Sequence, residues 1–310
     1  MKILLTANKT LSNGKAKWLD STYYNLYLPL IDLGHEVYFW DTVKPENPNY
    51  QKVIDIFKPD LIFCCLTADL GLSPFEQAVW DVIPGETQKG KIKTFNWFCD
   101  DTWRFDSFSS KVCSMFTACS TPEPDYVEKY RNIGYNNIIV GGWHANDSFY
   151  LKQECEKKYD VTFIGQMNNP DRKKYIEYLR TNGVDVHNFH GLSHDEMVKV
   201  WSETKIGLNF SKNYNGVPVR TQMKLRPFEI SAAKGTMIMS EHHSGLKYFY
   251  DIDKEIVTFT SPEEMLKKIK ILLANEKIRN KIAIAGNNRF YKDHTSHKRI
   301  QKIIEEISRI

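Results

Sequence analysis

The sequence predicts an α/β protein of two doubly wound domains, each with a parallel sheet covered by helices on both faces. Short apolar runs alternate with stretches of helical periodicity along the whole chain. This alternation restarts after a polar, charged segment at residues 150–158. The chain has 310 residues, which is long for one ordinary α/β domain and suits two domains of about 150 residues each.

In the first half, the opening strand at residues 2–8 leads into a helical stretch that ends at Gly34. Glycine suits the left-handed backbone position that closes a helix. The expected strands continue at residues 35–40, 61–65, 94–99, 116–120 and 137–140, with helices at residues 51–57 and 125–132. Strands joined through helices in this way pair in parallel.

The second half repeats the pattern. Its strands are expected at residues 160–164, 184–189, 205–210, 236–239 and 255–259, and its helices at residues 171–179, 194–201, 226–233 and 262–273. We therefore expect an N-terminal domain at residues 1–152, a C-terminal domain at residues 153–287 and a helical tail at residues 288–310. Ligands of such sheets bind at the carboxyl ends of the strands, so the carboxyl edges of the two domains should face one cleft.

Composition and charge exclude several classes of protein. Hydrophobic residues at 42% and charged residues at 26% indicate a globular chain. No stretch approaches the roughly 20 apolar residues of a membrane span, and the six cysteines form no C-x-x-C pair, so we expect a cytoplasmic protein with reduced thiols. Residues 267–310 hold 12 basic and 4 acidic residues. Such a tail is most often a solvated helix face, and docking to an anionic membrane or nucleic acid is the alternative.

Motifs for common cofactors and metals are absent. The chain has no G-x-G-x-x-G after its first strand, no P-loop, no H-E-x-x-H and no zinc-ligand spacing of histidines. Asp251 and Asp253 have the D-x-D spacing that some metal-dependent transferases use, but they lie in a turn before a strand, and we interpret them as loop carboxylates. We expect no metal and no cofactor.

A candidate anion site lies in the second half. Gly165 ends the strand at residues 160–164, and Arg172 follows in the first turns of the next helix, whose N-terminus attracts anions. Pro227 marks another helix start, with Lys224 and Arg226 beside it.

A carboxylate, Glu229, lies in the first turn of this second helix. Cations at a helix N-terminus suit a diphosphate, and a carboxylate beside them suits a diol such as ribose. The alternative is a salt-bridged helix start in which Glu229 pairs with Arg226.

Several segments together resemble the CgeB-like (spore-maturation-type) glycosyltransferases. They are KLRPFEISAAKG, EIVTF, SPEEMLKKIKILL and IAIAGNNRFYKDHTSHKRIQKII in the second half, and FNWFCDDTWRFDSF and YVEKYRNIGYNNIIV in the first. The resemblance covers nearly the whole chain and is weakest over residues 42–92. It implies a GT-B fold, meaning two Rossmann-like domains of which the second holds a nucleotide-sugar donor, and a tail that crosses back onto the first domain.

The resemblance also implies roles for individual residues. Glu229 would bind the ribose hydroxyls, and arginine or lysine side chains would neutralise the diphosphate leaving group in place of a metal. Asn209 and Ser211 would line the donor pocket. The implied donor-binding positions are Gly165, Arg172, Asn209, Ser211, Lys224, Arg226 and Glu229. Lys234 departs from the family pattern, which has a small residue there.

Candidate catalytic residues follow the strand at residues 94–99. Asp100 and Asp101 lie at its carboxyl end, and Asp101 is our candidate for the general base that an inverting transferase needs. The alternative is that the pair caps the next segment and pairs with Arg104. His144 near the domain junction is a further candidate, and the loop at residues 8–14 is placed to touch acceptor or donor phosphate.

The sequence thus predicts a metal-independent glycosyltransferase that moves a sugar from a nucleotide-sugar to a glycan or other hydroxyl acceptor. One alternative is a nucleotide-sugar epimerase of the same architecture, which would need no acceptor. Another is a non-catalytic protein that binds nucleotide-sugars or glycans. The basic tail would suit DNA or an anionic surface polymer. The nucleotide, the sugar and the stereochemistry have no residue signature.

Overall fold

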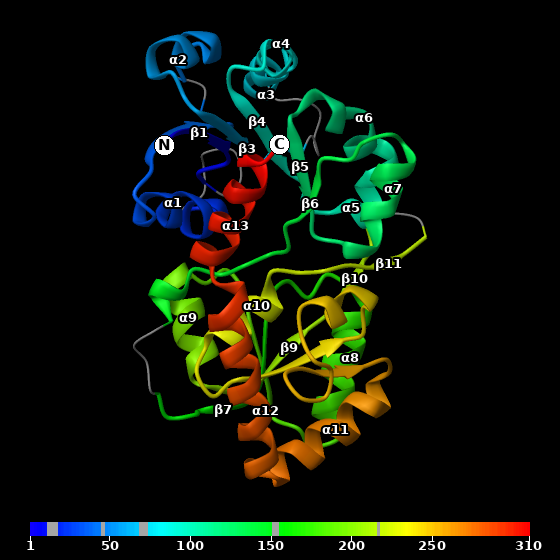
Figure 1. Cartoon of the computed structure of the whole chain (residues 1–310). Helices are drawn as coiled ribbons and strands as arrows, with labels where there is room; N and C mark the ends of the chain where they lie inside the picture. The colour runs from blue at the N-terminus through cyan, green and yellow to red at the C-terminus, as the bar shows by residue number, and fades with distance from the viewer. Residues whose placement is uncertain (11–17, 45–46, 68–73, 151–154, 216–217) are drawn as a thin grey trace. The chain divides into compact units, whose positions relative to one another are not determined.

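The computed structural model describes residues 1–10, 18–44, 47–67, 74–150, 155–215 and 218–310. The chain divides into two compact units, each built on a parallel sheet (Figure 1). The first contains Met1–Gly142 and Ser296–Ile310, and the second contains Trp143–Thr295. The boundary after Gly142 precedes the one expected after residue 152.

The first unit has a sheet of strand order β2-β1-β3-β4-β5-β6. Its strands are β1 (Lys2–Ala7), β2 (Glu36–Asp41), β3 (Leu61–Cys64), β4 (Lys93–Trp97), β5 (Ala118–Thr121) and β6 (Ile138–Val140). Its helical segments are η1 (Tyr23–Tyr27), α1 (Leu28–Asp32), α2 (Tyr50–Phe57), α3 (Pro74–Trp80), α4 (Ile83–Lys89), α5 (Asp101–Arg104), η2 (Phe105–Ser109), α6 (Ser110–Val112), η3 (Cys113–Met115), η4 (Pro124–Tyr126), α7 (Val127–Asn132) and α13 (Ser296–Ser308). All residues of β3 and β5 are buried, which explains their continuous apolar or small-residue character.

The last helix, α13, packs on the first unit although it follows the second unit in sequence. Ile300, Ile303 and Ile307 form its buried face at a spacing of three and four residues. The Nε2 atom of His297 lies 3.2 Å from the Asp32 carboxylate of α1. The tail expected from residue 288 therefore divides, with residues 288–295 in the second unit.

The second unit has a sheet of strand order β13-β12-β9-β7-β8. Its strands are β7 (Tyr159–Ile164), β8 (Val186–Phe189), β9 (Thr204–Asn209), β12 (Met237–Glu241) and β13 (Val257–Phe259), with a separate antiparallel pair, β10 (Lys212–Asn213) and β11 (Arg220–Thr221). Its helical segments are η5 (Asp147–Phe149), α8 (Pro170–Thr181), α9 (His194–Ser202), α10 (Arg226–Ala232), η6 (Ser244–Tyr248), α11 (Pro262–Ala274), α12 (Glu276–Arg289) and η7 (Phe290–His294). Throughout the described residues, every helix is too short or too polar to cross a membrane.

Local sequence explains where the main helices of this unit begin. The Asn169 side chain accepts the first free N–H groups of α8, and Pro170 follows it at the first helical position. Ser193 and Glu196 form a capping box at α9. These caps fix the first turns of α8 and α9. Within the described residues, the helix α10 has no side-chain cap and begins at Arg226 followed by Pro227.

Candidate functional site

Two arginines of the second unit lie against one aromatic ring. The guanidinium carbons of Arg172, in α8, and Arg226, in α10, are 5.7 and 4.9 Å from the ring centroid of Phe163. Phe163 belongs to β7 and is fully buried. Burial and the charge of Arg172 lower the pKa of Arg226 to about 10, and burial lowers the pKa of Arg172. Two cations this close repel each other, so the arrangement favours an anion between or beside them.

Arg226 is fixed by hydrogen bonds to the ends of two strands. Its Nε donates to the carbonyl oxygen of Ile164 at 2.9 Å, and one terminal nitrogen donates to Asn209 Oδ1 at 3.1 Å. A Cβ atom at Gly165 would lie 2.9 Å from the Phe163 ring and 3.0 Å from the other terminal nitrogen of Arg226. The φ of Gly165 is +154°, which side-chain-bearing residues rarely adopt. Glycine is therefore required here for the guanidinium to lie against the backbone.

Arg172 has fewer partners. One terminal nitrogen donates to the carbonyl oxygen of Gln166 at 3.2 Å, and its buried Nε has no hydrogen-bond partner in the part of the chain that the structure describes. Asn169 Oδ1 accepts the backbone N–H groups of Asp171 and Arg172 at 3.0 and 3.3 Å. Because Asn169 already satisfies these helix-end donors, the cationic group that α8 offers to a ligand is the Arg172 side chain.

Glu229 lies one helical turn after Arg226. Its carboxylate accepts no hydrogen bond and joins no ion pair within the described residues, so the salt bridge of the alternative interpretation is not formed. Burial raises the pKa of Glu229 to about 7, and the positive charge of Arg226 opposes this shift. The buried hydroxyl of Tyr150, whose pKa is raised by burial and by the charge of Glu229, also has no partner among these residues. Both groups keep their hydrogen-bonding capacity for a ligand.

Asn209 and Ser211 form hydrogen bonds that hold neighbouring parts of the arginine site. Both side chains are buried. Asn209 Nδ2 donates to Ser240 Oγ at 2.9 Å, while Asn209 Oδ1 accepts the hydrogen bond from Arg226. Ser211 Oγ donates to the carbonyl oxygen of Glu241 at 2.9 Å. The polar atoms of both side chains are thus occupied by neighbouring groups. The sequence suggested that Asn209 and Ser211 line the donor pocket, whereas in the structure Asn209 holds Arg226 and Ser211 holds the end of β12. Lys224 is partly exposed, two residues before α10.

Sequence reasoning missed Lys212, which links three elements. Its Nζ lies 2.6 Å from Asp171 Oδ2 and 3.4 Å from Glu241 Oε1. The buried Glu241 carboxylate also accepts the backbone N–H groups of Ser211 and Lys212, each at 2.9 Å. The start of α8, next to Arg172, is thereby tied to the end of β12. No local sequence pattern marks Lys212, because its partners lie 41 and 29 residues away in the sequence.

In the first unit, the geometry of Asp101 does not fit the base role that the sequence suggested. Its carboxyl group has no exposed surface, and its two oxygens accept from Ser109 Oγ at 2.7 Å and from Tyr130 OH at 2.9 Å. Burial raises its pKa to about 6. A carboxyl group enclosed in this way cannot reach an acceptor hydroxyl. Asp100 has 23% of its side chain exposed and lies 3.7 Å from Arg104, as the alternative interpretation expected.

Other residues that the sequence singled out are His144, Asp251 and the loop at residues 8–14. His144 is fully buried next to Ala145, which bridges to Thr295 at the other end of the second unit. Asp251 pairs with Lys254 at 2.9 Å, which agrees with a loop carboxylate. Residues 11–14 of the loop at residues 8–14 lie outside the described residues.

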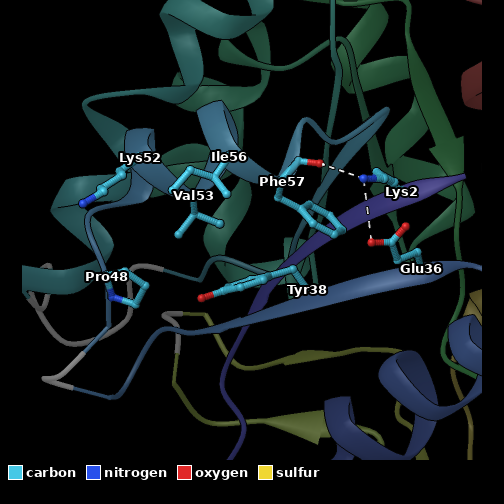
Figure 2. Close-up of a pocket in the computed structure, with 8 residues that line it drawn as sticks. All are labelled: Lys2, Glu36, Tyr38, Pro48, Lys52, Val53, Ile56 and Phe57. Carbon is cyan, nitrogen blue, oxygen red and sulfur yellow. Dashed lines mark hydrogen bonds and ion pairs between the residues drawn. The ribbon is translucent and has the colours of Figure 1, made fainter.

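A hollow of about 390 Å³ lies in the first unit between β2 and α2 (Figure 2). Its walls include Tyr38, Phe57 and Ile56, and Lys2 at its rim is 3.8 Å from Glu36. It contains none of the candidate residues and includes the first residues of β1 and β2, whereas ligands of parallel sheets bind at the carboxyl ends. It is therefore separate from the arginine site.

Residues 150–305 match the family model described as glycosyl transferase-like. No curated protein matches the chain.

Solved structures are similar over almost their full length. Sucrose-phosphate synthase from Thermosynechococcus elongatus has a TM-score of 0.65 and 9% identity, covering 99% of this chain and 98% of that one. Anabaena HepE in complex with UDP-glucose has a TM-score of 0.61 and 12% identity, covering 100% of both chains. T4 phage BGT in complex with its UDP-glucose substrate has a TM-score of 0.62 and 13% identity, covering 100% of this chain and 98% of that one. These similarities confirm the predicted fold, two Rossmann-like domains of the GT-B class.

Proposed function

Because the chain belongs to the glycosyl transferase-like family, it is a glycosyltransferase, and we propose that Arg172, Arg226 and Glu229 bind its nucleotide-sugar donor. One observation carries the proposal. Two guanidinium groups share the Phe163 ring at the carboxyl edge of the second sheet, beside a half-buried carboxylate with no hydrogen-bond or ion-pair partner among the described residues. A nucleoside diphosphate offers what this arrangement needs, an anion for the arginines and a ribose diol for Glu229.

The same groups act on the leaving group. During transfer the bond between the anomeric carbon and the diphosphate oxygen breaks, and negative charge grows on the diphosphate. Fixed guanidinium groups in a partly buried site stabilise that charge more in the transition state than in the donor, which lowers the barrier. We propose that this replaces a metal ion in neutralising the leaving group.

The proposal names a nucleotide for the donor and only a chemical class for the acceptor. Uridine diphosphate is the first nucleotide to test, because HepE and T4 phage BGT are described in complex with UDP-glucose. The acceptor is proposed as a glycan or other hydroxyl compound. The finer assignment to the CgeB-like glycosyltransferases is supported by the segments of sequence that resemble them, and a cytoplasmic location by the cysteine pattern.

The test is nucleotide binding by the wild type, by Glu229→Gln and by the control Glu177→Gln, whose side chain is 55% exposed on α8. Melting temperatures are recorded with UDP, GDP, dTDP and CDP and with their glucose conjugates, in EDTA. A ligand at 100 times its dissociation constant stabilises the wild type by about 2.7 kcal/mol. Loss of a charged hydrogen-bond acceptor should weaken binding by about tenfold or more in Glu229→Gln, while Glu177→Gln binds as the wild type does.

Two outcomes would contradict the proposal. If no nucleotide raises the melting temperature, the arginine site is not a donor site. If Glu229→Gln binds as tightly as the wild type, the carboxylate does not bind ribose. Product analysis without acceptor distinguishes transfer from epimerisation, because only an epimerase converts the donor alone into an isomeric nucleotide-sugar.

A further inference from the structure

In the second unit, the corner between α11 and α12 exposes isoleucines and lysines together. The two helices meet at this corner in Figure 1. They are joined through Asn275 alone. Three isoleucines around this corner are about half exposed, Ile271 at 48%, Ile278 at 50% and Ile284 at 57%. Four lysines are exposed beside them, namely Lys267, Lys270, Lys277 and Lys281. We call these seven residues the elbow surface.

The positive charge of the elbow surface is not neutralised by its surroundings. None of its four lysines forms an ion pair within the described residues, whereas the neighbouring Lys268 pairs with Glu264 at 2.8 Å. Glu276 is the acidic residue closest to the corner in sequence, and it lies 4.0 Å from the buried Arg279. The elbow surface is therefore a local cationic patch.

Helical spacing places these residues on outward faces. Lys267, Lys270 and Ile271 are spaced i, i+3, i+4 on α11, and Lys277, Lys281 and Ile284 are spaced i, i+4, i+7 on α12.

Each helix has a separate inward face. Met265, Ile269 and Leu272 on α11 and Ile282 and Ala283 on α12 belong to the core of the second unit. The exposed isoleucines are therefore additional to the residues that fold this unit, and their exposure needs another explanation.

We propose that the elbow surface docks onto an anionic lipid bilayer. Each lysine near an anionic lipid surface strengthens binding by about fivefold, and isoleucine side chains enter the boundary between headgroups and acyl chains. A nucleic acid would use the lysines but leave the isoleucines in water. A protein interface would be depleted in lysine. The bilayer is the partner that uses both kinds of side chain.

The test is binding of the full chain to vesicles, which is independent of donor binding. Sedimentation is measured with vesicles of phosphatidylcholine alone and with 30% phosphatidylglycerol. We expect binding to the anionic vesicles alone, weakened about tenfold or more in Ile271→Ser/Ile278→Ser and also in Lys277→Gln/Lys281→Gln. The control is Ile56→Ser, which changes an isoleucine that is 72% exposed in the first unit, and it should bind like the wild type.

Other results would overturn the proposal. They are absence of wild-type binding to anionic vesicles, and binding that the isoleucine substitutions leave unchanged. Retention on DNA that depends on the lysines but not on the isoleucines, without vesicle binding, would identify a polyanion site. Because the substituted side chains are exposed, circular dichroism should show unchanged melting. If the isoleucine variant misfolds, the lysine variant still decides.

Discussion

Asp100 and Asp101 are neighbours in sequence with different surroundings. Asp101 lies in the core of the first unit, bonded to Ser109 and Tyr130, while Asp100 reaches the surface beside Arg104. The sequence identified the pair because both follow a buried strand. The sequence does not predict which of the two carboxylates faces solvent. That depends on the backbone conformation at the start of α5, where Asp100 is the N-cap and Asp101 the first helical residue.

Asp101→Asn should change how stability depends on pH. The folded-state pKa of Asp101 is raised from 3.8 to about 6, so the folded state binds the proton more tightly than the unfolded state does. The stability that this provides is fully present below about pH 4 and is lost as pH rises through 6, amounting to about 3 kcal/mol. Relative to the asparagine variant, the wild type should lose free energy of unfolding between pH 4.5 and 7, measured by urea denaturation.

The turnover of Asp101→Asn and Asp100→Asn tests which of the two carboxylates acts in catalysis. At equal folded fraction, Asp101→Asn should keep its turnover within a few-fold of wild type, because the side chain is enclosed. Asp100→Asn should lower kcat by about 100-fold if Asp100 is the base. Unchanged kcat in Asp100→Asn would remove this residue from the base role, and identical pH dependence of stability in Asp101→Asn and wild type would show that Asp101 titrates as an exposed carboxyl.

Among the elements, the connection between α8, β10 and β12 depends on Lys212. Asp171 is 41 residues and Glu241 is 29 residues away in sequence from this lysine. Asp171 precedes Arg172, so the ion pair fixes the helix turn that carries one of the two proposed phosphate-binding arginines. Lys212 is a positioning residue in this arrangement.

Lys212→Met should raise the donor KM by about tenfold, corresponding to about 1.4 kcal/mol of lost donor binding. The control is Lys205→Met, since Lys205 Nζ lies 2.6 Å from Asp160 with similar exposure, and this pair does not involve α8. Lys205→Met should lose about 1 kcal/mol or less of stability, as partly exposed ion pairs do. Lys212→Met should lose more, because it also leaves the buried Glu241 carboxylate without its cation. An equal KM in the two variants would show that Lys212 serves stability alone.

Elements with strong local signals were predicted well. The helix expected at residues 262–273 is α11, Pro262–Ala274, because Ser261 caps it and Pro262 begins it. The helix α12 was not predicted. Its contacts rely on small residues such as Gly286, where a Cβ atom would meet the carbonyl oxygen of Glu255, so its apolar periodicity is weak. The short β10–β11 pair likewise lacks any alternation of apolar residues.

The residues of the candidate site also fall into those that the sequence predicted and those that it did not. Arg172, Arg226 and Glu229 could be identified because they lie beside helix starts that sequence patterns mark. The Lys212 network could not, because its ion pairs join residues that only the folded sheet brings together.

For the whole molecule, the first unit is assembled from two distant stretches, Met1–Gly142 and Ser296–Ile310. The chain passes through the entire second unit before α13 completes the first. Ile303 is 3% exposed, and its Cδ1 would lie 3.4 Å from a Cβ atom at Gly141, next to the end of β6. The amphipathic sequence of α13 predicts that it packs on a core, but periodicity does not say which core.

Ile303→Ala should therefore destabilise the first unit by about 2–4 kcal/mol, the cost of a large-to-small substitution in a core. Hydrogen exchange read by mass spectrometry should show faster exchange in β1, β2 and α1, while β9 and β12 keep their protection, because each sheet has its own core. Ile310→Ala is the control, since Ile310 is 44% exposed and should change neither unit. Equal loss of protection in β9 and β12 would mean that α13 stabilises both units together, and the division of the chain at Ser296 would not describe how it unfolds.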